Sequence, residues 1–313
     1  MDNLPTESLV KIFTFLGSKD LLNMAKTCKK FNQVIMDFMP IRYPSIRIDF
    51  QYLYYNKVQK FTYKDNYNGE RDFNCLLDTT RLYQNYIFTN FSKEHTDRLG
   101  SKWLQLFKKQ INARCIRIKS DCMDLQQLSN LIKLTHRLVF LEIDGYRIAK
   151  MEQPLDETEA IQLPSLKHLK IHSFLDTSPQ IFRIFQDCRT LKSISLSSLF
   201  FINKKIKSIS DFILHQRALE QLDLIGLDSH NALFSNDSVH DVRFKLKKIN
   251  CEYNGYSFNL EKFAVMFCRQ KSFKEVTLAL DLRNSSQPAQ DEKHCDAIIR
   301  HVMSSCDHLA SLN

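Results

Sequence analysis

The sequence predicts an α/β repeat fold, with short parallel strands and outer helices, preceded by a unit of three short helices. Two observations carry this prediction. Apolar residues recur at helical spacing three times within the first 40 residues. Beyond residue 110, a short apolar pattern returns every 25 to 28 residues, and helical stretches lie between its copies. Such a period is typical of solenoids, in which each unit packs against its neighbours.

The N-terminal unit is defined by three apolar stripes. Leu9, Ile12, Phe13 and Leu16 follow the i, i+3, i+4, i+7 spacing that puts four side chains on one face of a helix. We expect Thr6 to be the N-cap of this helix. Two further stripes lie at residues 21–28 and 31–38. Three helices of this length cannot hide all their apolar residues from one another, so we expect a partner to bind this unit.

The residues of this unit follow the pattern of a known family. The sequence reads Leu4-Pro5-x-Glu7-x-Leu9-x-x-Ile12-Phe13-x-x-Leu16-x-x-x-Asp20-Leu21-Leu22-x-x-Ala25-x-x-Cys28-Lys29-x-Phe31-x-x-Val34-Ile35. It resembles the F-box over the whole motif without a gap, with Phe31 where the family often has Trp. The resemblance implies a three-helix module that binds the Skp-type adaptor of a cullin–RING ubiquitin ligase.

By position in the motif, the resemblance also implies which residues contact the adaptor. They are Leu4, Pro5, Leu9, Ile12, Phe13, Leu16, Leu21 and Leu22. The alternative is that the three helices only cover the end of the domain that follows.

The repeating part is defined by the pattern apolar-x-x-apolar-x-apolar. Its copies are Ala113/Ile116/Ile118, Leu138/Leu141/Ile143, Leu166/Leu169/Ile171, Leu191/Ile194/Leu196, Leu219/Leu222/Leu224, Leu246/Ile249/Cys251 and Phe273/Val276/Leu278. Weaker copies lie around residues 83–88 and 46–48. One strand and one helix at this period predict a leucine-rich-repeat solenoid, and residues 188–196 resemble the cysteine-bearing repeats that often follow an F-box.

The helical stretches between the copies are expected at residues 125–134, 181–188, 209–215, 260–267 and 297–304. We therefore divide the chain into an F-box at 1–40, a connecting region with weak early repeats at 41–112, and a solenoid at 113–313. The alternative is a doubly wound α/β domain, which should have longer apolar strands and a glycine-rich phosphate turn. Neither is present in the sequence.

Side chains alternate along a strand, so the residues between the buried ones should line the concave face of the solenoid. This surface is mixed in charge, which suits a folded protein or a peptide better than a polyanion. We therefore predict that a protein target binds here. The charged residues expected to bind it are Arg117, Lys119, Glu142, Asp144, Lys170, His172, Asp223 and Glu252.

Composition places the chain in the cytoplasm or the nucleus. It has no apolar run long enough to span a membrane and no basic segment followed by an apolar one at its start, so we expect neither a membrane anchor nor a secretory signal. Nine cysteines are dispersed without CxxC pairs and are expected to be reduced. The formal net charge of +9 favours acidic partners weakly and identifies none.

Other classes of function are less favoured. Tyrosines interleaved with lysines and arginines at residues 43–88 could bind nucleic acid, but early strands explain them better. The histidines and cysteines at 294–308 lack the spacing of a zinc site, so we expect no metal. No P-loop, HExxH, GxGxxG or nucleophile elbow occurs, so we expect neither a cofactor nor catalytic residues.

These observations predict the substrate-recognition subunit of an SCF-type ubiquitin ligase, which holds a target for ubiquitination by other subunits. A ligase-independent scaffold is one alternative, and a nucleic-acid-associated repeat protein is a less favoured one.

Overall fold

The structure is a computed structural model of the 313-residue chain. It describes residues 4–16, 18–38, 46–49, 74, 77, 84–91, 101–109, 113–149, 163–173, 180–197, 200–201, 207–229, 234, 239, 242–253, 259–282, 287–305 and 311–312. The expected tyrosine-rich region at 43–88 and the last cysteine and histidine of the 294–308 cluster lie largely outside these residues.

The N-terminal unit contains three helices, as predicted. They are α1 (Thr6–Thr14), α2 (Ser18–Thr27) and α3 (Lys29–Phe38). The N-cap of α1 is Pro5 and no side chain caps the helix, so the assignment of Thr6 as N-cap was wrong by one residue. The extended backbone of Pro5, with ψ at 149°, turns the chain into the helix without needing a hydroxyl. Both α1 and α2 pack against α3.

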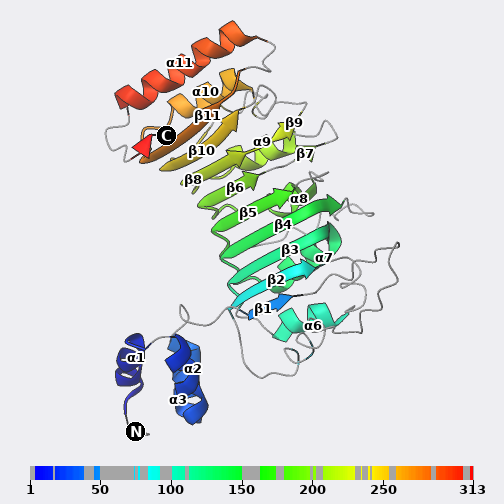
Figure 1. The fold of residues 1–313 in the computed structure, drawn as a ribbon, viewed down its shortest axis with the longest axis vertical. Coiled ribbons are helices and arrows are strands. Elements are labelled where there is room, and N and C mark those ends of the chain that lie inside the picture. Colours follow the sequence, from blue (N-terminus) through cyan, green and yellow to red (C-terminus); the bar gives the residue numbers. More distant parts are fainter. Residues whose placement is uncertain are drawn as a thin grey trace, which may run out of the picture.

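The rest of the described chain is organised around one parallel sheet of ten strands (Figure 1). The strand order β1-β2-β3-β4-β5-β6-β8-β10-β11-β12 follows the chain. The strands are β1 (Ile46–Asp49), β2 (Asn85–Phe91), β3 (Cys115–Asp124), β4 (Phe140–Ala149), β5 (His168–Ser173), β6 (Ser193–Ser197), β8 (Gln221–Ile225), β10 (Lys248–Tyr253), β11 (Glu275–Leu280) and β12 (Ser311–Leu312). Two further strands, β7 (Phe200–Phe201) and β9 (Asp228–Ser229), pair separately.

The register of the sheet aligns the predicted apolar pattern from strand to strand. Ile116 lies opposite Leu141, which lies opposite Leu169, and the same match continues through later strands. The weak copies also belong to the sheet, because the strand around Ile46 pairs with the one around Tyr86. These aligned residues are almost fully buried, so each repeat adds one layer to a continuous core.

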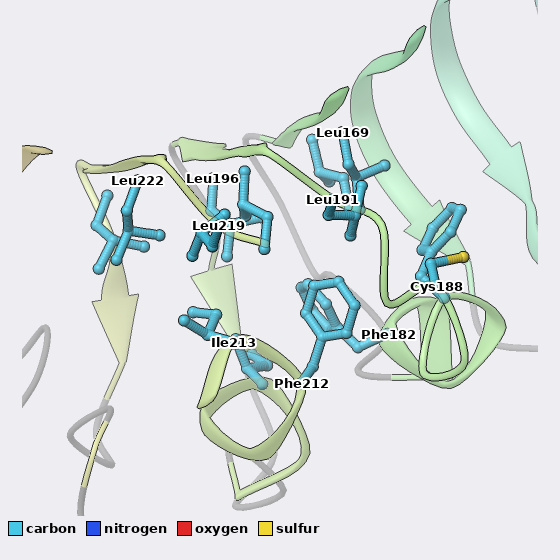
Figure 2. Packing of buried hydrophobic residues seen from close by; sticks show 14 of the residues in the cluster. Leu169, Phe182, Cys188, Leu191, Leu196, Phe212, Ile213, Leu219 and Leu222 are labelled. Carbon is cyan, nitrogen blue, oxygen red and sulfur yellow. The ribbon is translucent and has the colours of Figure 1, made fainter. Parts of the chain in front are cut away.

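The helices of the repeat region are α6 (Ser101–Lys109), α7 (Leu125–Leu134), α8 (Gln180–Ile184), α9 (Lys207–Leu214), α10 (Leu260–Cys268) and α11 (Pro288–Ser305). Each of α6, α7 and α8 packs against the next helix in the chain, and α10 packs against α11. Figure 2 shows this packing for α8 and α9, where Phe182 and Phe212 point toward leucines of the strands. Strand residues alternate between buried and partly exposed, which means that only one face of the sheet is covered.

The expected helix boundaries held best where the apolar pattern was strong. The helix expected at 125–134 is α7 itself, whereas the one expected at 297–304 begins at Pro288. The first turns of α11 are polar and mostly exposed, so an apolar pattern does not reveal them. Proline at the first helical position has the backbone angle a helix start needs.

The strand order decides between the two folds considered from the sequence. In a doubly wound sheet the order in which strands are added reverses at a switch point, and helices cover both faces. Here each strand of the ten-stranded sheet pairs beside the one before it in the chain, and the apolar core lies against one face of the sheet. The chain is thus a three-helix unit followed by a parallel sheet with helices, consistent with an α/β repeat solenoid.

Candidate partner-binding surfaces

The three N-terminal helices share a small core of their own. Its buried members are Leu9, Phe13, Phe31, Val34 and Ile35, which form a cluster separate from that of the sheet. The rings of Phe13 and Phe31 meet edge to face with centroids 5.5 Å apart. This core is small for an independent unit, so its stability is modest.

The chain before α1 is attached to α3 by a polar contact. The Nζ of Lys30 donates a hydrogen bond of 2.8 Å to the carbonyl oxygen of Leu4. The side chain of Leu4 also packs against the core, and Pro5 beside it is exposed. The Leu-Pro segment is therefore held in a defined position at the start of α1.

One face of α1 carries exposed apolar side chains. Ile12 is 47% exposed and Phe15 is 88% exposed, which is unusual for residues this large. With Ser8 they follow an i, i+4, i+7 spacing, so they share one helical face. We call Ile12 and Phe15, with Pro5 at the helix start, the α1 patch. Large apolar side chains exposed on one helix face make the α1 patch a candidate interaction site.

The structure divides the eight predicted adaptor contacts into groups. Leu9 and Phe13 are buried at 1% and 0% exposure, so both lie inside the helical unit and support its fold. Pro5 and Ile12 are exposed, and Leu4 and Leu16 are partly buried against the core. The side chains of the other two, Leu21 and Leu22, lie outside the described residues. Adaptor contact by any of the eight stays a prediction.

Phe15 is the exposed residue that sequence reasoning missed. The stripe at 9, 12, 13 and 16 predicts a single apolar face, and Phe15 falls outside it. In the structure α1 turns Leu9 and Phe13 toward α3, which leaves Ile12 and Phe15 on the outside. The i, i+3 relation between Ile12 and Phe15 was the available signal.

The second candidate surface is the sheet face that does not carry the core, which we call the open face. Seven of the eight predicted target-binding residues align there in two rows across the strands. The first row is Arg117, Glu142, Lys170, Ser195 and Asp223. The second is Lys119, Asp144, His172 and Ser197. The eighth, Glu252, lies on β10, and its Oε2 accepts a hydrogen bond from the Gly226 amide at 3.2 Å.

Most of these side chains pair with one another across strands. The carboxylate of Glu142, whose side chain is only 14% exposed, forms two ion pairs. Its Oε2 lies 3.2 Å from Arg117 Nε, and its Oε1 lies 3.0 Å from Lys170 Nζ. Lys119 pairs with Asp144 at 3.2 Å, and the His172 ring bonds the Ser197 hydroxyl at 2.7 Å. Exposed ion pairs of this type contribute about 0–1 kcal/mol each. Their main consequence is to fix the side chains of the open face in place.

Asp223 differs from the rest of the open face. Its Oδ2 accepts a hydrogen bond from Gln221 Nε2 at 3.0 Å, but its Oδ1 is buried without a partner. Burial raises the pKa of this carboxyl, although Gln221 opposes the shift. A buried acceptor without a donor costs free energy, which a donor from a bound partner would recover.

Comparison with known proteins identifies the first of the two regions. The profile of the F-box-like family matches residues 1–39. The N-terminal helices are an F-box-like domain. No curated protein matches the chain. The match covers the three helices and ends before β1, so it does not describe the sheet.

The described residues also bear on three other kinds of feature: a metal site, a membrane-spanning helix and a reactive thiol. Within them, no group of three or more His, Cys, Asp or Glu side chains could hold a metal ion. No described helix is long and apolar enough to cross a membrane. Burial raises the pKa of Cys188 to about 12 and also raises that of Cys251, so neither thiol is a ready nucleophile.

Proposed function

We propose that this protein is the substrate-recognition subunit of an SCF-type cullin–RING ubiquitin ligase. The observation that carries the proposal is an F-box-like domain whose first helix presents Ile12 and Phe15 to solvent. An F-box-like domain suggests binding of a Skp-type adaptor, and the α1 patch is the surface we assign to that contact. The cullin is reached through the adaptor.

The sheet supplies the other half of the proposed function. We infer that its units are divergent leucine-rich repeats, because each adds one strand and, in most cases, one helix every 25 to 28 residues. The open face then binds a protein target. Its paired side chains form a fixed pattern of both charge signs, which favours one partner over others through complementarity.

The mechanism we propose is proximity. A target held by the sheet is kept near the ubiquitin-conjugating enzyme that the cullin carries, so its lysines react at a high effective concentration. The chain itself supplies binding surfaces and no catalytic group. It works in the cytoplasm or the nucleus, where the adaptor and cullin reside.

The test is capture of adaptor and cullin from lysate by the intact chain and by an Ile12→Asp, Phe15→Asp variant. The matched control is Ile299→Asp, Met303→Asp, because these apolar residues of α11 are also exposed, at 48% and 79%. We expect the intact chain and the control to capture both proteins, and the first variant to lose both.

Other outcomes lead to other conclusions. Capture of adaptor without cullin would favour a ligase-independent scaffold. No capture by a folded intact chain would contradict the proposal and leave the helices as a cover for the following domain.

A further inference from the structure

The segments that lead from the helices or loops into the strands form one edge of the sheet. We call the described segments directly before β3, β4, β5, β6, β8, β10 and β11 the basic edge. They are residues 113–114, 135–139, 163–167, 186–192, 215–220, 242–247 and 269–274. Because the strands are parallel and follow the chain order, these segments lie side by side at the same edge (Figure 1).

The basic edge concentrates the positive charge of the protein. It holds twelve lysines and arginines against two acids, Asp187 and Glu220, which is an excess of ten. The whole chain has an excess of nine, so the remainder is close to neutral. All twelve cationic side chains are exposed. The charge is therefore on the surface and available to a ligand.

Backbone hydrogen bonds place part of this charge in a row. The Lys192 amide donates to the Lys167 carbonyl at 2.7 Å, and the Lys274 amide donates to the Lys247 carbonyl at the same distance. Neighbouring strands are about 4.8 Å apart, so Lys192 follows Lys167, and Lys274 follows Lys247, at about one strand spacing. Its one acid, Glu220, lies between Lys192 and Lys247 and pairs with both.

A cavity of about 600 Å³ opens in the middle of this edge, between the C-terminal ends of α8 and α9. Arg183, Arg189, Arg217 and Arg243 line it together with two acids, Asp187 and Asp211, so its charged lining has an excess of two positive charges. None of the four arginines is in an ion pair within the described part of the chain. Phe182 and Phe212 form its apolar side, with ring centroids 5.6 Å apart; Figure 2 shows both rings. Guanidinium groups bind phosphate through two parallel hydrogen bonds.

The field of this edge already acts on a neighbouring residue. His168 begins β5, directly after the 163–167 segment. Burial lowers the pKa of His168, and the charges of Lys167 and Lys192 lower it further. A group that resists protonation at this position agrees with a positive potential along the edge.

The composition of the edge narrows the class of ligand. Its phenylalanines, Phe244 and Phe273, are buried, and the exposed rings of these segments are the imidazoles of His136 and His215. Protein interfaces are centred on exposed aromatic and apolar anchors and are depleted in lysine. Membrane-binding surfaces usually add apolar side chains that enter the lipid. A long row of lysines and arginines without such anchors fits a chain of phosphates.

We propose that the basic edge binds the phosphate backbone of nucleic acid without regard to sequence, with one phosphate held in the arginine cavity. The edge has no exposed Phe, Tyr or Trp ring, so we expect phosphate contacts to dominate and single strands and duplexes to bind about equally. This site is distinct from the α1 patch and the open face, and its test does not depend on the adaptor.

The experiment measures binding of labelled duplex DNA and single-stranded RNA of mixed sequence to the full chain, by fluorescence anisotropy, over a range of salt. The cavity variant replaces Arg183, Arg189, Arg217 and Arg243 by glutamine. A row variant replaces Lys167, Lys247 and Lys274 by glutamine. The control for the cavity variant removes four charges elsewhere, in K26Q, K108Q, K293Q and R300Q, all at exposed positions. The first three of these substitutions alone are the matched control for the row variant.

We expect the intact chain to bind both probes with a steep salt dependence. The cavity variant should bind at least about tenfold more weakly, with a slope of log affinity against log salt reduced by about 0.9 for each lost phosphate contact on duplex DNA. The row variant should weaken binding in the same way, and both controls should bind like the intact chain.

Three results would overturn the proposal. The first is no binding of either probe by the folded intact chain. The second is an equal loss in the controls and in the cavity and row variants, which would indicate net charge alone. The third is binding to phosphatidylserine vesicles, abolished by the same variants, with no binding to nucleic acid.

Discussion

Phe13 and Phe15 lie two residues apart on α1 and should respond in opposite ways to the same substitution. Phe13 is fully buried against Phe31, whereas Phe15 is 88% exposed. Truncating a buried Phe to Ala costs about 3–5 kcal/mol. A unit of this size rarely has more than about 3–5 kcal/mol of stability in total. Phe13→Ala should therefore unfold the F-box-like domain for most of the time.

Substitution of the exposed Phe15 should affect adaptor affinity rather than the stability of the domain. Phe15→Ala removes no buried contact, so the stability of the domain should change by less than about 0.5 kcal/mol. If an adaptor covers this ring, its loss removes about 1.5–3 kcal/mol of burial, which weakens the affinity roughly 10- to 100-fold. The two variants thus separate folding of the domain from contact with its partner.

The assay is hydrogen–deuterium exchange of the full chain, followed by titration with purified adaptor. In Phe13→Ala we expect fast exchange throughout α1–α3 and unchanged protection of the strands, because the two cores share no residue. In Phe15→Ala we expect protection as in the intact chain and weaker adaptor binding. Loss of strand protection in Phe13→Ala, or full adaptor affinity in Phe15→Ala, would refute the reasoning.

Two further predictions concern the sheet. Because burial raises the pKa of Asp223, its ionisation opposes folding above the ordinary carboxyl pKa of about 4. Asp223→Asn should raise the thermal unfolding midpoint at neutral pH, and the gain should vanish at lower pH; a gain that persists in acid would contradict this. Cys188 and Cys251 should react with iodoacetamide far more slowly than the half-buried Cys28 in the native chain, and mass spectrometry of the peptides checks it.

The positions of the sheet strands could be predicted from the sequence but not all of their lengths, because β3 and β4 continue past their triplets to Asp124 and Ala149. A triplet such as Leu166/Leu169/Ile171 carries the information locally, because two of its residues alternate on one face of a strand and the first enters the core from the preceding turn. The helix α11 could not be delimited in the same way. Its first half is polar, and the buried apolar residues Ile298 and Val302 lie in its second half, where His301 also contacts Phe267 of α10.

The surfaces were harder to predict than the core. Alternation placed Arg117, Glu142 and Lys170 on the same face, but only the register of β3, β4 and β5 shows that Glu142 pairs with both cations. Similarly, the apolar stripe of α1 did not reveal which side faces α3. That choice depends on how three helices pack together, and it leaves Phe15 outside.

The parallel register explains why one molecule can present two charged surfaces of different character. Residues at equivalent positions of successive repeats lie in rows across the sheet. A residue type that recurs at one position of the repeat therefore forms a row of like side chains. On the open face the signs alternate and neutralise one another across strands, so this face can discriminate between shapes but exerts little long-range attraction. On the basic edge the signs agree, so the field adds up and would draw in any polyanion. A protein target that fits the open face and lies on nucleic acid would therefore meet both surfaces at once, and neither contact would need to be strong alone.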